Sequence, residues 1–138
     1  MNAMSFTTKR TILFGDCDPA GIVYTPRVSY FVIEAVHEFL THKLGAPGIR
    51  EILDMGILPP ARAFSMEFLA PMAWDETISI EVRCKELTTT SFSFFVEARN
   101  HANEVTFRST LTQVAVSPET KRPVPLPPRL RGALSAPY

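Results

Sequence analysis

Two aspartates two residues apart, Asp16 and Asp18, are the side chains whose type and spacing could do chemistry near the start of the chain. They lie in the segment 14–26, which reads FGDCDPAGIVYTP. The glycines, the two acids and the proline disrupt both helix and strand, so this segment predicts a loop. A carboxylate with a reference pKa near 3.9 is ionised at neutral pH, and it can act there as a nucleophile or as a general base.

The loop leads directly into an expected helix over residues 26–44. Thr25 is a favourable N-cap, Pro26 sacrifices no needed N–H at the first helical position, and Gly45 is the expected stop in a left-handed conformation. At about 1.5 Å per residue this helix is about 30 Å long. Its free N-terminal amides could stabilise an oxygen on which negative charge develops, next to a carboxylate that attacks the same carbon.

Other interpretations of the acidic pair remain open at this point. Aspartate before proline commonly initiates turns, so Asp18 could be a turn residue. Asp16 could fix the loop by accepting backbone N–H bonds. No histidine or third acid follows at ligand spacing, so we expect no metal site. Cys17 lies between two acids that should raise its pKa, which makes it a poor nucleophile and favours a small, buried packing role.

Alternating and helical apolar patterns predict the elements that must position this loop. We expect strands over 7–14, 63–69, 77–86, 91–99 and 104–116, one or two helical turns in 49–55, and a last helical turn in 129–134. Phe64, Met66 and Phe68 should share one face of their strand, and a change of apolar parity near 111–114 indicates a bulge or a stretch covered on both faces. Apolar residues extend most of the way round the helix, which should therefore be wrapped by the sheet or by a partner.

These elements predict an α+β fold in which an antiparallel sheet is wrapped around one long central helix. We expect a single domain over residues 1–138. Within it, residues 1–5 are expected to be disordered or left over from an expression vector, and 118–138 form a proline-rich C-terminal tail.

Composition narrows the function classes. The 14 basic residues balance the 14 acidic ones, so the net charge is zero, which argues against nucleic-acid binding and favours self-association. No apolar run approaches the roughly 20 residues that span a bilayer. With two cysteines, Cys17 and Cys84, and no signal peptide, we expect a cytoplasmic protein with free thiols.

Residues 15–23, GDCDPAGIV, resemble the active-site loop of the hotdog-fold 4-hydroxybenzoyl-CoA thioesterase family, which includes the YbgC-type acyl-CoA thioesterases. The resemblance covers about residues 6–117. It implies a hotdog fold, hydrolysis of an acyl-CoA thioester with Asp18 as the catalytic carboxylate, and no cofactor beyond the coenzyme A of the substrate. It also implies homodimers formed through the sheets, homotetramers built from two dimers back to back, and active sites at the dimer interface.

The resemblance also assigns roles to other residues. The backbone N–H of Thr25, with Tyr24 adjacent, is the expected oxyanion donor. Asp16 and Gly21 should position the loop, Gly21 through close approach of the substrate or a positive φ. Substrate-binding candidates are Tyr24, Tyr30, Thr90 and Ser91, and Phe64 and Trp74 are further candidates for the acyl pocket.

The sequence departs from the family pattern in two places. Val36 stands where many members carry Arg, and the hairpin 88–92 (TTTSF) lacks the basic residues with which some relatives contact the coenzyme A phosphates. Arg83, Lys85, Lys121 and Arg122 are the basic residues that could compensate. Coenzyme A is therefore the favoured carrier, and acyl carrier protein is the alternative.

Several alternatives to this reading stay open. Glu34 is the second candidate for the catalytic acid, because another branch of hotdog thioesterases carries it on the helix. A hydratase or dehydratase would need a histidine near the acid, and none occurs between Asp18 and Val36. A non-catalytic acyl-binding module is the third possibility. The acyl group, and the choice between direct attack and general-base catalysis, do not follow from the sequence.

Overall fold

The computed structural model describes residues 5–45 and 47–135. Its elements, in chain order, are β1 (Ser5–Thr11), the 3₁₀ turn η1 (Phe14–Asp16), the 3₁₀ turn η2 (Thr25–Arg27), α1 (Val28–Leu44), α2 (Gly48–Asp54), β2 (Ala61–Phe68), β3 (Thr77–Leu87), β4 (Ser91–Arg99), β5 (Val105–Val114) and α3 (Pro128–Ser135).

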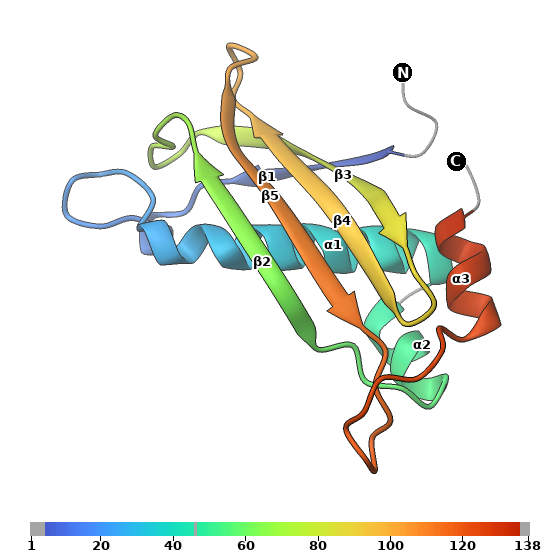
Figure 1. The fold of residues 1–138 in the computed structure, drawn as a ribbon. Helices are drawn as coiled ribbons and strands as arrows, with labels where there is room; N and C mark the ends of the chain where they lie inside the picture. Colours follow the sequence, from blue (N-terminus) through green and yellow to red (C-terminus); the bar gives the residue numbers. More distant parts are fainter. Residues whose placement is uncertain (1–4, 46, 136–138) are drawn as a thin grey trace.

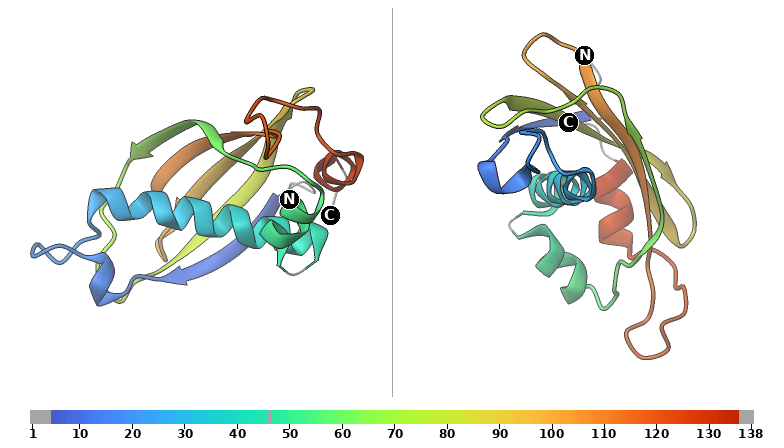
Figure 2. Two further views of the ribbon diagram at one scale, coloured as in Figure 1. Left: turned by 90° about the horizontal axis from the view of Figure 1, so that it is seen from below. Right: turned by 90° about the vertical axis from the view of Figure 1, so that its left-hand side faces the viewer.

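The five strands form one antiparallel sheet in the order β1-β3-β4-β5-β2. The sheet curves around α1, which lies along its concave face (Figures 1 and 2). β1 and β2 are the two edges of the sheet. The predicted arrangement of an antiparallel sheet around one long helix is therefore confirmed.

The core lies between α1 and the sheet. Eight residues of α1 are buried: Val28, Phe31, Val32, Ala35, Val36, Phe39, Leu40 and Leu44. The alternating residues of β4 face them, and the rings of Phe39 and Phe94 meet edge to face at 5.7 Å. Val36 is fully buried in this core, so the position where many relatives carry Arg is here a packing residue.

The first strand ends three residues before its predicted end. β1 stops at Thr11, and Ile12 is fully buried. Leu13 and Phe14 were expected to continue the strand, but they are 57% and 75% exposed and lead into η1. Ser5, expected to be disordered or vector-derived, is the first residue of β1; residues 1–4 and 136–138 lie outside the described residues.

The start of the long helix also differs from the prediction. A 3₁₀ turn over Thr25–Arg27 precedes α1, and no side chain caps either element. The expected N-cap role of Thr25 is therefore wrong. Gly45 ends α1 as predicted, with φ 90° and its N–H bonded to the Thr41 carbonyl.

Around β2 and β5 the sheet is irregular. The change of apolar parity near 111–114 predicts a bulge or a stretch covered on both faces. The register shift lies in the facing strand β2, between Ala61 and Ala63, and the adjacent residues Gln113 and Val114 are both buried, so the second alternative fits β5. The end of β5 is buried because the chain returns over it, with the N–H of Val124 bonded to the Ala115 carbonyl. α3, longer than the predicted turn, then buries Leu130 and Leu134 beside the C-terminal part of α1 (Figure 1).

Candidate active site

The loop with the two aspartates is a small β-hairpin. Cys17 pairs with Val23 as an antiparallel bridge. The N–H of Tyr24 donates to the Asp16 carbonyl at 2.9 Å, and the N–H of Asp18 donates to the Ile22 carbonyl at 3.0 Å. Gly21 closes the turn with φ 82°, a conformation that residues with a side chain rarely adopt. The hairpin projects beyond the N-terminal end of α1 (Figure 1).

Asp18 lies on one strand of this hairpin and is partly exposed. Its Oδ1 accepts the backbone N–H of Ala20 at 2.8 Å, so the turn fixes the orientation of its carboxylate. No protein partner of Oδ2 occurs among residues 5–45 and 47–135. Asp18 faces Ile22 across the hairpin, and residues paired in this way project to the same side.

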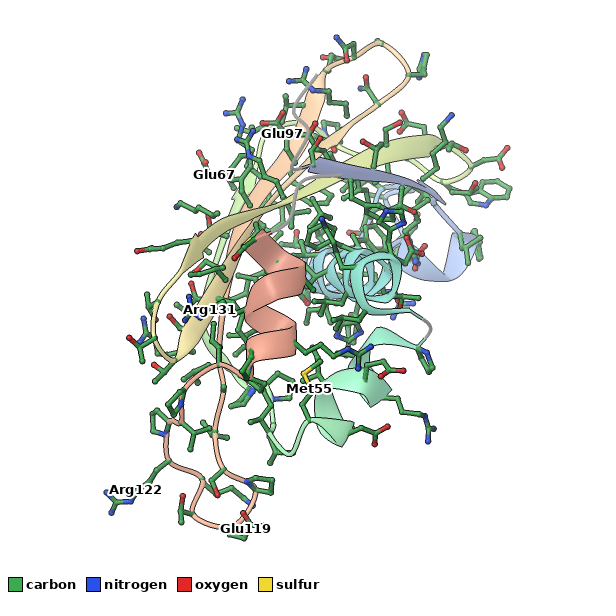
Figure 3. All side chains as sticks on the ribbon, turned by 90° about the vertical axis from the view of Figure 1, so that its right-hand side faces the viewer. Met55, Glu67, Glu97, Glu119, Arg122 and Arg131 are labelled. Atoms are coloured by element: carbon green, nitrogen blue, oxygen red, sulfur yellow. The ribbon has the colours of Figure 1, made fainter. Side chains whose placement is uncertain are left out.

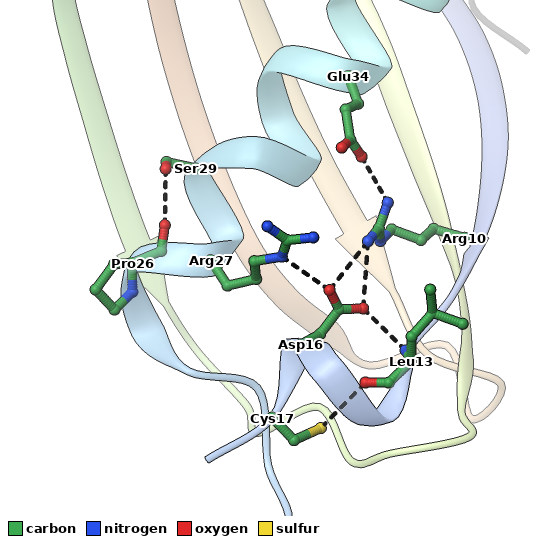
Figure 4. A network of polar contacts seen from close by, with 8 residues as sticks. All are labelled: Arg10, Leu13, Asp16, Cys17, Pro26, Arg27, Ser29 and Glu34. Atoms are coloured by element: carbon green, nitrogen blue, oxygen red, sulfur yellow. Dashed lines mark hydrogen bonds and ion pairs between the residues drawn. The ribbon is translucent and has the colours of Figure 1, made fainter.

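Asp16 is held at the root of the hairpin, with only 1% of its side chain exposed. Its Oδ2 accepts the Leu13 N–H at 2.8 Å, and Arg27 Nε and Arg10 Nη2 donate to its Oδ1 at 2.8 and 3.2 Å (Figure 4). Burial alone would raise the pKa of Asp16, but the hydrogen bonds from Leu13, Arg27 and Arg10 outweigh it and lower the pKa. Asp16 therefore stays ionised and serves to fix the loop.

The amides at the helix start differ in their availability. The N–H groups of Val23 and Tyr24 donate to the carbonyls of Met72 and Asp16. Tyr24, expected as an oxyanion donor beside Thr25, therefore has no free N–H. The N–H of Thr25 has no hydrogen-bond partner within the described part of the chain, and the next residue is Pro26, which has none to donate.

Thr25 borders a pocket of about 280 Å³. The wall of this pocket is otherwise apolar, with Ile22, Val23, Val28, Phe68, Leu69, Ala70, Pro71 and Met72 as its other residues. Asp18 is not one of the lining residues. Ile22, which faces Asp18 across the hairpin, does line the pocket.

The other aromatic candidates do not line the pocket. Tyr24 and Tyr30 are 57% and 55% exposed, and the guanidinium of Arg27 lies 5.1 Å from the Tyr30 ring. Trp74, which is 57% exposed, packs edge to face on Phe14 with 5.5 Å between ring centroids. Phe64 lies on β2 and is 37% exposed.

Thr90 and Ser91 belong to the turn from β3 to the start of β4, and this turn lies at the end of the sheet away from the hairpin of Asp18 (Figure 1). Ser91 is 3% exposed, and its hydroxyl shares a 2.6 Å hydrogen bond with the Thr88 hydroxyl. Neither Thr90 nor Ser91 lines the pocket of its own chain, and their expected contact with substrate stays a prediction. Arg131 of α3 donates to the Thr88 carbonyl and is a basic side chain at this turn (Figure 3).

Glu34, the second candidate for the acid, is bound elsewhere. Its Oε2 accepts Arg10 Nη1 at 2.5 Å, and it does not line the pocket. Cys17 is partly buried, and its thiol pKa is raised by desolvation, with the charges of Asp16 and Asp18 adding to the shift. The expected poor nucleophilicity of this thiol therefore has two physical causes.

Arg10 and Arg27 are the site residues that the sequence analysis did not identify. Arg10 is separated from Asp16 by six residues, and Arg27 by eleven, so no local spacing connects them. The sequence did contain one signal that Arg27 has an acidic partner. Arg27 is a cation at the positive end of a helix, which is unfavourable unless an anion compensates. Asp16 supplies that anion.

Two kinds of feature are absent from the described residues, a metal-binding group of side chains and a membrane-spanning helix. They contain no group of three or more His, Cys, Asp or Glu side chains that could hold a metal ion. None of the helices within 5–45 and 47–135 is long and apolar enough to cross a membrane. His37, His42 and His101 all lie outside the pocket lining.

The antiparallel sheet curved around α1, with an apolar pocket and an unpaired amide at the helix start, places the chain among hotdog-fold enzymes that hydrolyse thioesters. Residues 12–134 match the thioesterase-like superfamily. The chain belongs to this superfamily.

Individual relatives are CoA thioester hydrolases. The chain is 34% identical to the 4-hydroxybenzoyl-CoA thioesterase of Pseudomonas sp. (strain CBS-3) over 92 residues, which span 65% of this chain and 64% of that protein. It is 26% identical to the 1,4-dihydroxy-2-naphthoyl-CoA hydrolase of Picosynechococcus sp. (strain ATCC 27264 / PCC 7002 / PR-6) over 130 residues, 91% of this chain and 88% of that protein. The crystal structure of a 1,4-dihydroxy-2-naphthoyl-CoA thioesterase from Synechocystis shares the fold, with TM-score 0.86, 20% identity and coverage of 94% and 95%.

Proposed function

We propose that the chain hydrolyses an acyl-CoA thioester to a free acid and coenzyme A, with Asp18 as the catalytic carboxylate and the Thr25 amide as the oxyanion donor. The observation that carries this proposal is that Thr25, whose N–H is unpaired among the described residues, lines an apolar pocket at the helix start, beside a hairpin that orients Asp18. An amide in such a place can stabilise the oxyanion of a tetrahedral intermediate with little reorganisation. The names of the relatives support coenzyme A as the carrier.

The reaction can proceed by two routes that share these residues. In the first, Asp18 Oδ2 attacks the thioester carbon, the carbonyl oxygen becomes an oxyanion at the Thr25 N–H, and collapse expels the thiolate and leaves a mixed anhydride that water cleaves. In the second, Asp18 takes a proton from water as the water attacks the same carbon. In both routes the thiolate receives a proton from solvent. A thiol with a pKa near 8.5 leaves readily, so we propose that no cofactor is needed.

We propose that the working form is a homodimer paired through β2. This edge strand is largely exposed, and Phe64, Phe68 and Leu69 on and beside it are 37%, 52% and 47% exposed. An unpaired edge with exposed apolar side chains is a favourable surface for pairing with a second copy. Because Phe68 and Leu69 line the pocket, the partner would cover it and enclose the substrate. Two dimers joined through the outer faces of their sheets would give a tetramer.

The pocket lining supports an uncharged, apolar acyl group. Thr25 is its only polar residue. A carboxylate buried there without a partner would be strongly unfavourable.

We also propose a cytoplasmic location, which suits the free thiols of Cys17 and Cys84.

A panel of a dozen acyl-CoAs, followed by the release of free thiol, tests this function. We expect hydrolysis of apolar aliphatic or aromatic acyl groups, and at least about tenfold lower kcat/KM for acyl groups that end in a carboxylate. Absence of thiol release from every member of the panel would contradict the proposal. Acyl carrier protein loaded with the best acyl group tests the alternative carrier.

A further inference from the structure

The carboxylate of Asp16 joins three parts of the chain whose relative positions the proposed reaction requires to be fixed. It accepts hydrogen bonds from Leu13 just before η1, from Arg10 of β1 and from Arg27 at the start of the long helix. Its own carbonyl accepts the Tyr24 N–H from the second strand of the hairpin. One buried residue thus ties both strands of the hairpin to the helix start (Figure 4).

Two arginines hold this residue from opposite sides. Arg10 Nη2 reaches both carboxylate oxygens at 3.2 Å, and Arg10 Nη1 bonds Glu34 at 2.5 Å. Its guanidinium lies 4.1 Å from the centre of the Phe31 ring, which fixes its plane against α1. Arg27 makes a single bond to Asp16 through Nε, and its side chain is 40% exposed.

We propose that Arg10 and Arg27 are positioning residues that act through Asp16, and that this clamp fixes Asp18 relative to the Thr25 amide. The inference rests on the proposed function. Asp18 lies two residues after Asp16, and Thr25 lies two residues before Arg27. Each reacting group is therefore close in the chain to a residue of the clamp. Neither arginine lines the pocket, and both bind the Asp16 carboxylate, so we assign them a positioning role.

Arg27 is the better residue to change, because Asp16 keeps Arg10 and the Leu13 amide when Arg27 is removed. In Arg27→Gln the hairpin and the helix start should lose their fixed relation. A displacement of about 1 Å can lower a rate by about 10²-fold. We expect kcat to fall by that order while KM for the best acyl-CoA changes less than about threefold, because substrate contacts persist.

A matched control exists on the outer face of the sheet. Glu97 is also held by two arginines, and Arg108 Nε reaches it at 2.7 Å with a side chain that is 42% exposed. Glu97 lies on the side of the sheet away from α1 (Figure 3). Arg108→Gln should therefore remove an equivalent ion pair and keep the kcat of the parent.

A conservative replacement gives a second test. An ammonium group can supply the single hydrogen bond that Arg27 makes to Asp16. Arg27→Lys should consequently recover most of the kcat that Arg27→Gln loses, to within about tenfold of the parent.

Amide hydrogen exchange tests the clamp without any substrate. The Tyr24 N–H, bonded to the Asp16 carbonyl, should exchange at least about tenfold faster in Arg27→Gln than in the parent or in Arg108→Gln. Amides of β4 and β5 should keep their rates in all three proteins. If the parent hydrolyses no acyl-CoA, the proposed function fails, but the hydrogen exchange experiment still decides whether the clamp exists.

The proposal would be overturned if Tyr24 exchange or kcat were unchanged in Arg27→Gln. It would also be overturned if Arg108→Gln lowered kcat as much as Arg27→Gln does. A rise in KM at constant kcat would make Arg27 a substrate contact instead. Loss of the whole fold in Arg27→Gln would assign Arg27 to general stability and would equally overturn it.

Discussion

The backbone N–H of Tyr24 donates to the backbone carbonyl of Asp16 at 2.9 Å. This bond joins the two strands of the hairpin at Tyr24, the residue immediately before the helix start. The next residue, Thr25, lines the apolar pocket, and its amide has no partner in the described residues. The hairpin thus satisfies one amide and leaves its neighbour available, which is what an oxyanion donor requires.

The pH dependence of stability should report Asp16. Burial would raise its pKa from the usual 3.8, but the bonds from Leu13, Arg27 and Arg10 lower it. A group whose folded pKa is lowered stabilises the fold above its unfolded value, and this contribution disappears as the pH falls through the lower, folded value. Asp16→Asn should be less stable than the parent by about 1.5–3 kcal/mol at pH 7.

That difference in the free energy of unfolding should shrink as the pH falls from 4 towards 2, where Asp16 of the parent takes up a proton. Denaturant titrations of the parent and of Asp16→Asn at pH 7, 5, 3 and 2 measure it. A difference that is constant over this range would mean that the ionised carboxylate is not what stabilises the loop.

The contact between α1 and α2 depends on the absence of a side chain at Gly48. A Cβ there would lie 2.5 Å from the backbone nitrogen of Thr41 and 2.6 Å from the carbonyl carbon of Leu40. Backbone atoms of a long helix cannot easily move aside. We expect Gly48→Ala to lower the free energy of unfolding by about 1–3 kcal/mol, as measured by urea denaturation.

Gly132 in α3 is the control for this substitution. Nothing lies within 4 Å of the place of its Cβ. Gly132→Ala should therefore raise the free energy of unfolding by about 0.5–1 kcal/mol, because alanine favours a helix over glycine. Equal effects of the two substitutions would argue against the close packing of α2 on α1.

The edge strand β2 should carry the subunit interface. Phe64→Asp places a charge on this edge, so the chain should change from the mass of a dimer or tetramer to that of a monomer in light scattering after gel filtration, with loss of thioester hydrolysis. The control is Leu53→Asp, at a residue of α2 that is also exposed, by 46%. An unchanged mass for Phe64→Asp, or a monomeric parent, would contradict pairing through β2.

The sequence predicts most of the fold because local patterns and tertiary structure agree there. In β3 and β4 every second residue is apolar and faces α1, and the stripe of α1 matches its buried face. At the end of β1 the same reasoning fails. Phe14 continues the face begun by Ile12, and Leu13 that begun by Thr11, but the chain turns at Leu13, where its N–H donates to Asp16.

The site could be predicted only where it is contiguous in the chain. The hairpin and the helix start lie in one segment of the sequence, so Asp18 and Thr25 could be named together. The partners of Asp16 come from β1 and from the helix start, and only the folded chain brings them together. Likewise, only hydrogen bonding in the structure distinguishes the Tyr24 amide from that of Thr25.

Removal of the negative charge of Asp18 is the most direct measurement. Asp18→Asn keeps an oxygen for the Ala20 N–H, which Asp18 Oδ1 accepts at 2.8 Å, so the hairpin should persist. We expect kcat for the best acyl-CoA to fall by about 10²–10⁴-fold, with thermal unfolding unchanged. The control, Asp54→Asn on α2, should be as active as the parent. An Asp18→Asn protein that hydrolyses thioesters within twofold of the parent rate would contradict the central claim.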